Sequence, residues 1–253
     1  MILRYEVVII LSRMLTLATI LMVLTFAVQA QQSKKNHNGL SSFEKNGKYG
    51  YVDAKGNVRI EPQYELAYDF SEGLGLVRIN NKFGFVDRIG HIIIEPKYSL
   101  AISFSEGLAP VAIGGYPGKW GYIDKTGGWV IPINFDYALG FAGGFAAVKV
   151  DELWGYINKA GKTDIAPQYG NAGQFSEGLA PVSIGDKWGY IDKSGKIVIA
   201  LQFDGAEPFL NGVAKVGFEY DCSHCIDGLP PTMYLTTIKY IDKKGRYVEP
   251  TPK

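Results

Sequence analysis

The tetrad Asp-x-x-Gly recurs along this chain and constrains its fold more than any other feature. In five of the six units an aromatic residue precedes the Asp or Asn by four positions, and these aromatics are 34, 37, 34 and 34 residues apart. The first and last residues of the tetrads are Asp53 and Gly56, Asp87 and Gly90, Asp124 and Gly127, Asn158 and Gly161, Asp192 and Gly195, and Asp242 and Gly245. A period in this range is typical of repeat architectures, which are stabilised by stacking of similar units.

Each unit is predicted to contain about three antiparallel strands. In the fifth unit, residues 187–192 are rich in aromatic and β-branched residues, which favour a strand. Asp192 and Gly195 then turn the chain: the Asp side chain accepts from the backbone two residues on, and Gly adopts the left-handed conformation that closes a hairpin. Residues 196–199 return as the second strand and 212–216 form the third.

Counted from the turn Gly, five further positions repeat in all five full units: an aromatic at 8, Ala at 11, Phe at 14, Gly at 17 and Val at 21. Large aromatic residues bury the most apolar area, and a repeated Ala marks close packing against a neighbour. No unit has enough apolar surface to fold alone, so stability must come from neighbouring units.

The succession Lys-Trp-Gly-Tyr-Ile-Asp, Ile-x-Pro-x-Tyr and Phe-Ser-Glu-Gly-Leu resembles the WG-repeat family of bacterial proteins, from residue 48 to about residue 250. Departures include Tyr49 and Phe83 in place of the Trp, Ile238-Lys239 in place of the Trp-Gly pair, and Leu201 in place of a Pro. The resemblance implies an all-β repeat module at the cell surface or envelope.

Two architectures fit such units. Propeller blades usually carry four strands in about 40–45 residues, which is longer than the present spacing, and the last unit is an atypical, charged and Pro-terminated cap. We therefore expect an all-β, open, solenoid-like curved array of tandem repeats, with a closed propeller-like ring as the alternative.

The chain is predicted to have three parts. Two Arg residues followed by the apolar run 14–28 and Val-Gln-Ala are typical of a secretory signal peptide over residues 1–30, with an uncleaved membrane anchor as the alternative. Residues 31–46 form a polar lead-in, and residues 47–253 form the repeat domain. Its units are 48–81, 82–118, 119–152, 153–186, 187–237 and the partial unit 238–253. We expect a secreted protein in the periplasm or at the cell surface, with no membrane span after cleavage.

Charge and motifs give no indication of catalysis. Beyond residue 30 the chain has 24 basic and 24 acidic residues, so we expect no nucleic-acid partner. The repeated Asp and Asn have local turn roles, and Glu72, Glu106 and Glu177 are assigned to turns or solvated faces. The three His residues are not spaced as zinc ligands. We therefore expect no enzyme activity, no catalytic or metal-binding residues and no cofactor.

Two groups of residues remain as candidates. Cys222 and Cys225 lie in an insertion, where a local disulfide is the leading interpretation and a redox or metal role or free thiols are the alternatives. Trp120, Trp154 and Trp188 could contact a ligand, although core packing between units is the leading interpretation. We predict a binding or scaffold module for protein partners in the envelope. The alternative is a module that binds peptidoglycan or another cell-wall glycan through aromatic grooves.

Overall fold

A computed structural model describes residues 40–114, 118–217 and 238–249 of the chain. These residues form strands joined by turns, with no helix among them. The predicted signal segment, most of the lead-in, Cys222 and Cys225 lie outside the described residues. The prediction of an all-β fold is confirmed.

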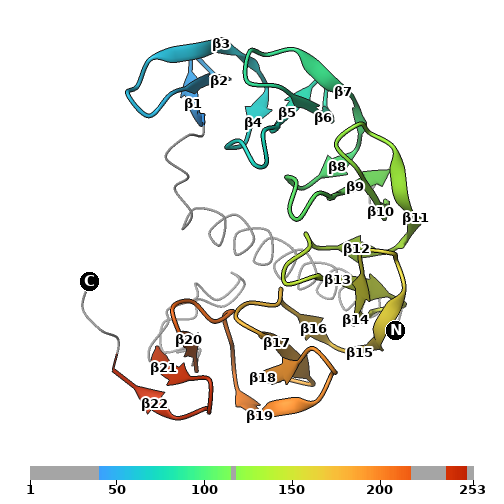
Figure 1. Cartoon of the computed structure of the whole chain (residues 1–253), viewed down its shortest axis with the longest axis vertical. Helices are drawn as coiled ribbons and strands as arrows, with labels where there is room; N and C mark the ends of the chain where they lie inside the picture. The colour runs from blue at the N-terminus through green and yellow to red at the C-terminus, as the bar shows by residue number, and fades with distance from the viewer. Residues whose placement is uncertain (1–39, 115–117, 218–237, 250–253) are drawn as a thin grey trace, which may run out of the picture. The chain divides into compact units, whose positions relative to one another are not determined.

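The strands form antiparallel sheets that follow one another along the chain (Figure 1). The first sheet has three strands, β1 (Ser41–Lys45), β2 (Lys48–Val52) and β3 (Val58–Tyr64). The last sheet also has three, β20 (Val213–Val216), β21 (Lys239–Asp242) and β22 (Tyr247–Val248). The four-stranded sheets between them contain β4 (Leu66–Ala67), β5 (Gly75–Ile79), β6 (Lys82–Val86) and β7 (Ile92–Tyr98); β8 (Leu100–Ala101), β9 (Ala109–Ile113), β10 (Lys119–Ile123) and β11 (Trp129–Phe135); β12 (Tyr137–Ala138), β13 (Phe145–Val150), β14 (Leu153–Asn158) and β15 (Thr163–Tyr169); and β16 (Asn171–Ala172), β17 (Leu179–Ile184), β18 (Lys187–Asp192) and β19 (Ile197–Phe203). None of the sheets closes into a barrel, and no strand pairing in the described ranges joins the first sheet to the last. The open array of tandem repeats is therefore confirmed.

The sheets do not coincide with the sequence units. In the second sheet, β4 and β5 come from unit 48–81 whereas β6 and β7 come from unit 82–118. Only Glu65 separates β3 from β4, so the chain passes directly from one sheet to the next. The sequence prediction of three strands per unit omitted the short strands such as β4, which pairs with β5. Two residues are too few to produce a recognisable strand pattern.

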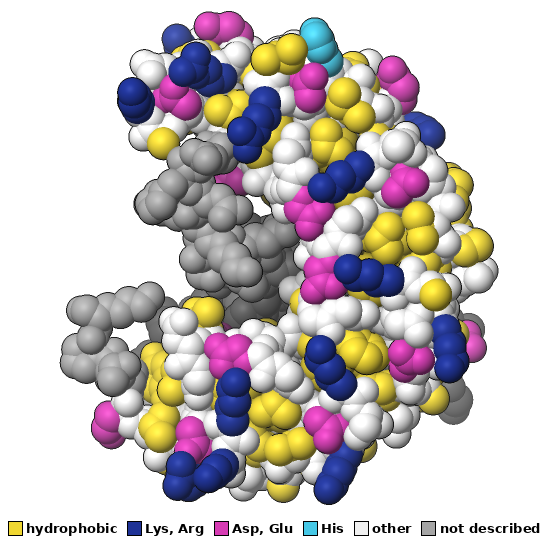
Figure 2. Space-filling model, viewed as in Figure 1, with side chains coloured by type: hydrophobic (Ala, Val, Ile, Leu, Met, Phe, Trp, Pro, Cys, Tyr) yellow, Lys and Arg dark blue, Asp and Glu magenta, His cyan; other side chains and the backbone are white. Residues whose placement is uncertain are grey.

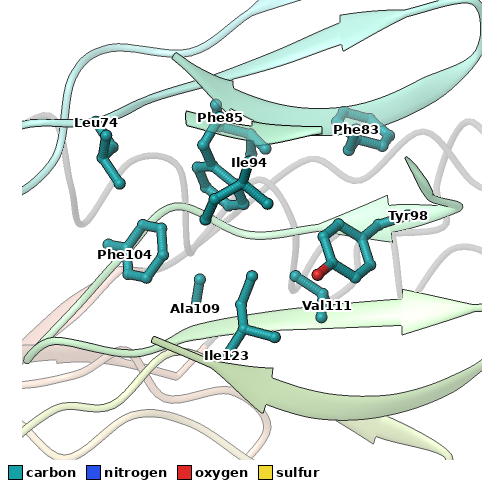
Figure 3. Close-up of a cluster of buried hydrophobic side chains, with 10 residues drawn as sticks. Leu74, Phe83, Phe85, Ile94, Tyr98, Phe104, Ala109, Val111 and Ile123 are labelled. Carbon is teal, nitrogen blue, oxygen red and sulfur yellow. The ribbon is translucent and has the colours of Figure 1, made fainter. Parts of the chain in front are cut away.

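The hydrophobic core lies between neighbouring sheets. Figure 3 shows Phe85 and Ile94 of the β4–β7 sheet in one cluster with Phe104, Ala109 and Ile123 of the adjoining sheet. Phe85 and Phe104 have ring centroids 4.8 Å apart. Equivalent ring pairs recur in the other units at 4.7–5.0 Å: Tyr51 with Phe70, Tyr122 with Phe141, Tyr156 with Phe175, and Tyr190 with Phe209. Burying each such ring contributes roughly 1.5–3 kcal/mol, so the sheets stabilise one another.

Candidate functional surface

The side chains of the turn Asp and Asn residues are bound by their own backbone. Asp124 Oδ1 accepts hydrogen bonds from the N–H groups of Thr126 at 2.8 Å and Gly128 at 3.0 Å. The same pair of bonds, from two and four residues on, occurs at Asp53, Asp87, Asn158, Asp192 and Asp242. The turn Gly residues have φ of 76–89°. The Thr126 hydroxyl and the backbone N–H groups lower the pKa of Asp124, which keeps this carboxylate ionised as a turn acceptor.

Three Glu residues join neighbouring sheets, a role that sequence reasoning missed. Glu106, in the β8–β9 loop, accepts from the N–H of Gly144 in the β12–β13 loop at 3.1 Å. Its carboxylate also lies 3.2 Å from Lys159 Nζ in the β14–β15 turn. The equivalent partners are Gly107 and Lys125 for Glu72, and Gly212 and Lys243 for Glu177. We call each set of Glu, Gly and Lys a glutamate clamp.

A serine hydroxyl adds a second bond at each clamped junction. Ser105 Oγ donates to the Phe141 carbonyl oxygen at 2.6 Å, and Ser71 and Ser176 make the same bond to Phe104 and Phe209. The junction between the β12–β15 and β16–β19 sheets has Ala142 and Gly143 at these positions. There Lys193 Nζ donates to the Gly143 carbonyl oxygen at 2.7 Å, and Gln174 Nε2 donates to the Gly140 carbonyl oxygen at 2.9 Å. All of these contacts hold sheets together.

Of the three Trp residues singled out from sequence, two are buried and the third, Trp188, packs partly buried against a core cluster. Trp120 is 2 % exposed and Trp154 is 6 % exposed, and Trp188 is half-buried. Tyr137 lies between the first two, with ring centroids 4.9 Å from Trp120 and 5.7 Å from Trp154. These side chains therefore contribute packing between repeats and do not form an open row of indoles.

Trp129, which sequence reasoning did not single out, is exposed. It lies on β11 and is 43 % accessible, with one edge against the ring of Tyr98 at 6.2 Å. Trp129 follows a turn Gly by two positions, and the equivalent residues in other units are Val58, Ile92 and Ile197. An apolar residue at this repeated position is the signal that could have identified it.

Exposed apolar side chains gather on the outermost strands of the sheets. Ile92 and Ile93 of β7 and Trp129 and Val130 of β11 are each 42–45 % exposed, and we call these four residues the outer patch. Figure 2 shows hydrophobic side chains among charged ones along the rim where Figure 1 places β7 and β11. Leaving such side chains in water costs free energy that a partner surface would recover.

Within the described ranges, no three His, Cys, Asp or Glu side chains group so that they could hold a metal ion. In the same part of the chain, no helix has the length and apolar character needed to cross a membrane.

The repeat pattern matches a known family. The family described as WG containing repeat matches residues 49–83, 83–116, 120–154, 154–188 and 188–218. The chain belongs to the WG containing repeat family. Each match begins at the aromatic residue of the Trp-Gly pair, so the resemblance noted from sequence is confirmed. Among curated proteins, none matches this chain.

Several solved structures are similar to this WG-repeat chain at low identity. A Bacteroides caccae protein of unknown function is 14 % identical, covers 83 % of this chain and 91 % of its own, and has a TM-score of 0.34. The extracellular domain of a B. thetaiotaomicron protein described as a one component system is 11 % identical, with 85 % and 36 % coverage and a TM-score of 0.43. Regucalcin, a calcium-binding protein from Agrobacterium tumefaciens, is 11 % identical, with 75 % and 84 % coverage and a TM-score of 0.36. The assignment rests on the repeat match, since these scores are too low to add to it.

In this WG-repeat chain, the Gly of each Trp-Gly pair faces a bulge in the next strand. Tyr49 pairs with Tyr64 and Tyr51 pairs with Ile60, so Gly50 alone faces three residues of β3. A Cβ on Gly50 would lie 2.4 Å from the Ile60 carbonyl oxygen. The family's two defining residues are thus the aromatic at the sheet interface and the Gly that admits the bulge.

Proposed function

We propose that this chain is a secreted, non-catalytic WG-repeat module that binds protein partners in the cell envelope through the outer patch. The observation that carries the proposal is the exposure of Ile92, Ile93 and Val130 on adjoining sheets. Covering aliphatic side chains with another apolar surface is favourable by about 25 cal/mol per Å² of apolar area removed from water. Protein surfaces supply such area, whereas the hydroxyl groups of sugars do not. The signal-like segment at residues 1–30 supports a location outside the cytoplasm.

Glycan binding is the second candidate, and Trp129 is the observation that favours it. An exposed indole offers a flat apolar face of the kind on which sugar rings stack. Trp120 and Trp154 are buried and cannot extend this surface into a groove.

The decisive experiment compares the envelope proteins that are retained by three immobilised forms of the chain: the wild type, a patch variant and a control variant. The patch variant carries Ile93→Lys and Val130→Lys. The control carries Thr163→Lys and Gln168→Lys on β15, which adds the same charge at exposed positions of another outer strand. Envelope proteins retained by the wild type and the control, but reduced about tenfold or more on the patch variant, would support the proposal. Identical sets on all three forms would refute it.

Co-sedimentation with purified peptidoglycan and insoluble polysaccharides tests the second candidate. Saturable pelleting that free sugar competes away, and that Trp129→Ala abolishes, would favour a glycan-binding module. Absence of pelleting by the folded protein would remove this alternative and leave the protein-binding proposal standing.

A further inference from the structure

The outermost strand of each sheet is an edge. In the described part of the chain, β3, β7, β11, β15 and β19 each pair with a neighbour on one side only. Each is seven residues long, and each contains the bulge opposite the Gly of the Trp-Gly pair. Edge strands present unpaired backbone N–H and C=O groups to other chains, and natural proteins protect them with charges, Pro residues, β-bulges or short length.

Besides the bulge, four of these five edges carry charged residues or Pro. β3 contains Arg59, Glu61 and Pro62; β7 contains Glu95, Pro96 and Lys97; β11 contains Pro132; and β15 contains Asp164 and Pro167. The remaining edges are β1, which carries Glu44 and Lys45, and strands of two to four residues. Every described edge other than β19 is therefore short or carries charged residues or Pro.

β19 is protected by neither charge nor Pro. Its sequence, Ile-Val-Ile-Ala-Leu-Gln-Phe, has no charged residue, and Leu201 stands where β3, β7 and β15 have Pro. Ile197 is 45 % exposed and Val198 is 46 % exposed. A seven-residue uncharged segment with high β-propensity and no Pro is well suited to adding another strand. The shared bulge cannot distinguish β19, because the protected strands have it too.

We propose that β19 pairs antiparallel with β19 of a second copy of this chain, which joins two four-stranded sheets across a twofold axis. Pairing in which Ala200 faces its own copy places Lys196 of one chain opposite Asp204 of the other. The ends of the strand are then charge-complementary, and the three central residues, Ile199, Ala200 and Leu201, are small or apolar. A twofold contact of this kind uses one surface patch on both copies.

The other outer strands fail the same pairing. The central residue of β3 is Glu61 and that of β7 is Glu95, so each would face an identical carboxylate of the other copy. The central residue of β11 is Pro132, which would face another Pro132. In β15, Pro167 would face Ile165. Like charges directly opposite each other destabilise a strand pair, and Pro cannot donate a ladder hydrogen bond. Self-association is thus specific to β19 among these strands.

The side chain of Asp204 has room for a second partner. It already pairs with Lys187 Nζ of its own chain, and it remains 39 % exposed. A second ammonium group from Lys196 of the other copy would complete a three-charge arrangement at each end of the joined strands. Because one strand pair is a small interface, we expect a reversible, concentration-dependent dimer.

Sedimentation velocity of the full chain, up to a concentration of about 500 µM, tests the proposal, because weak association becomes visible only near the Kd. Ala200→Glu and Leu201→Pro introduce residues that the equivalent strands already carry: β3 and β7 have Glu at the first position, and β3, β7 and β15 have Pro at the second. Both variants are therefore compatible with the fold. We expect each to raise the dimer Kd at least about tenfold. Ala166→Glu makes the matched change on β15 and should leave the Kd within about twofold of the wild-type value.

Two outcomes would overturn the proposal: a wild-type chain that stays monomeric throughout, or a dimer that Ala200→Glu and Leu201→Pro leave unchanged. Hydrogen exchange of the wild type keeps the test open if a variant fails to fold. The backbone amides of β19 should gain protection as concentration rises, and unchanged exchange there would also refute pairing through β19. This test is independent of the outer patch, so either proposal can fail alone.

Discussion

At the scale of single residues, the Gly of each Trp-Gly pair is required by close backbone approach. A Cβ on Gly155 would lie 2.6 Å from the Ile165 carbonyl oxygen and 2.7 Å from the nitrogen of Pro167. Such backbone atoms cannot move aside as a flexible side chain can. The turn Gly residues serve a second purpose, since a Cβ on Gly161 would meet the Ile131 side chain of the preceding sheet at 3.2 Å.

We therefore predict that Gly155→Ala destabilises the protein by about 3 kcal/mol or more, because the β14–β15 pair must separate to admit the methyl group. Gly170→Ala is the matched control. Its added Cβ would meet nothing closer than Ser183 Oγ at 3.6 Å, and its φ is not in the left-handed region. Urea unfolding followed by fluorescence measures both variants. Equal stability of the two would show that the bulge tolerates a side chain.

At the scale of single elements, the Ser-Glu-Gly turns store strain that the clamps offset. Glu72, Glu106 and Glu177 have φ of 52–53°, a left-handed conformation that costs a non-Gly residue roughly 1–2 kcal/mol. The Gly N–H and the Lys ammonium at the far side of the junction bind the carboxylate in return. The hydrogen bond from Lys243, with that from Gly212, lowers the pKa of Glu177. The turn is thus stabilised by the neighbouring sheet.

Substitutions of Glu106 should separate the effect of backbone strain on stability from the effect of the clamp contacts. Glu106→Ala removes both contacts and keeps the strained backbone, so we expect a loss of about 1–2 kcal/mol. Glu106→Gly removes the contacts but relieves the strain, so it should be less destabilising than Ala. Glu95→Ala, on the exposed face of β7, should change stability by less than about 0.5 kcal/mol.

A double-mutant cycle with Lys159→Met completes this test. If the clamp operates, the double variant should be less destabilised than the sum of the two single variants. Strict additivity would mean that Glu106 and Lys159 do not interact in solution.

At the scale of the whole molecule, the array depends on ionised carboxylates in every repeat. Asp124, Asp192 and Asp242 have lowered pKa values because they accept side-chain and backbone hydrogen bonds. A carboxylate with a lowered pKa in the folded state stabilises it fully above the unfolded pKa, and this stability is lost as pH falls through the folded value. Acid therefore weakens the turns that are closed by Asp, as well as the Glu177 clamp.

We predict that the melting temperature is constant between about pH 5 and 7 and falls progressively below about pH 4, near the ordinary pKa of Asp. Asn158 already provides the same turn hydrogen bonds without titrating. Asp192→Asn should consequently reduce the acid sensitivity while leaving the melting temperature at pH 7 nearly unchanged. Thermal unfolding by circular dichroism at each pH gives the comparison. A wild type equally stable at pH 3 and pH 7 would contradict this account.

The sequence by itself determined the repeat period, the all-β class and the turn positions, because these depend on residues within a few positions of one another. Asp192 and Gly195, for example, close their turn through bonds to the backbone of residues 192–196. Only the tertiary structure decided which sheet each strand joins, which Trp is exposed, what Glu106 contacts and which edge strand lacks protection. Those properties arise between sheets. The clamp of Glu106, for instance, joins it to Gly144, 38 residues further along the chain. Packing of neighbouring repeats brings such residues together, and short-range sequence patterns do not predict these contacts.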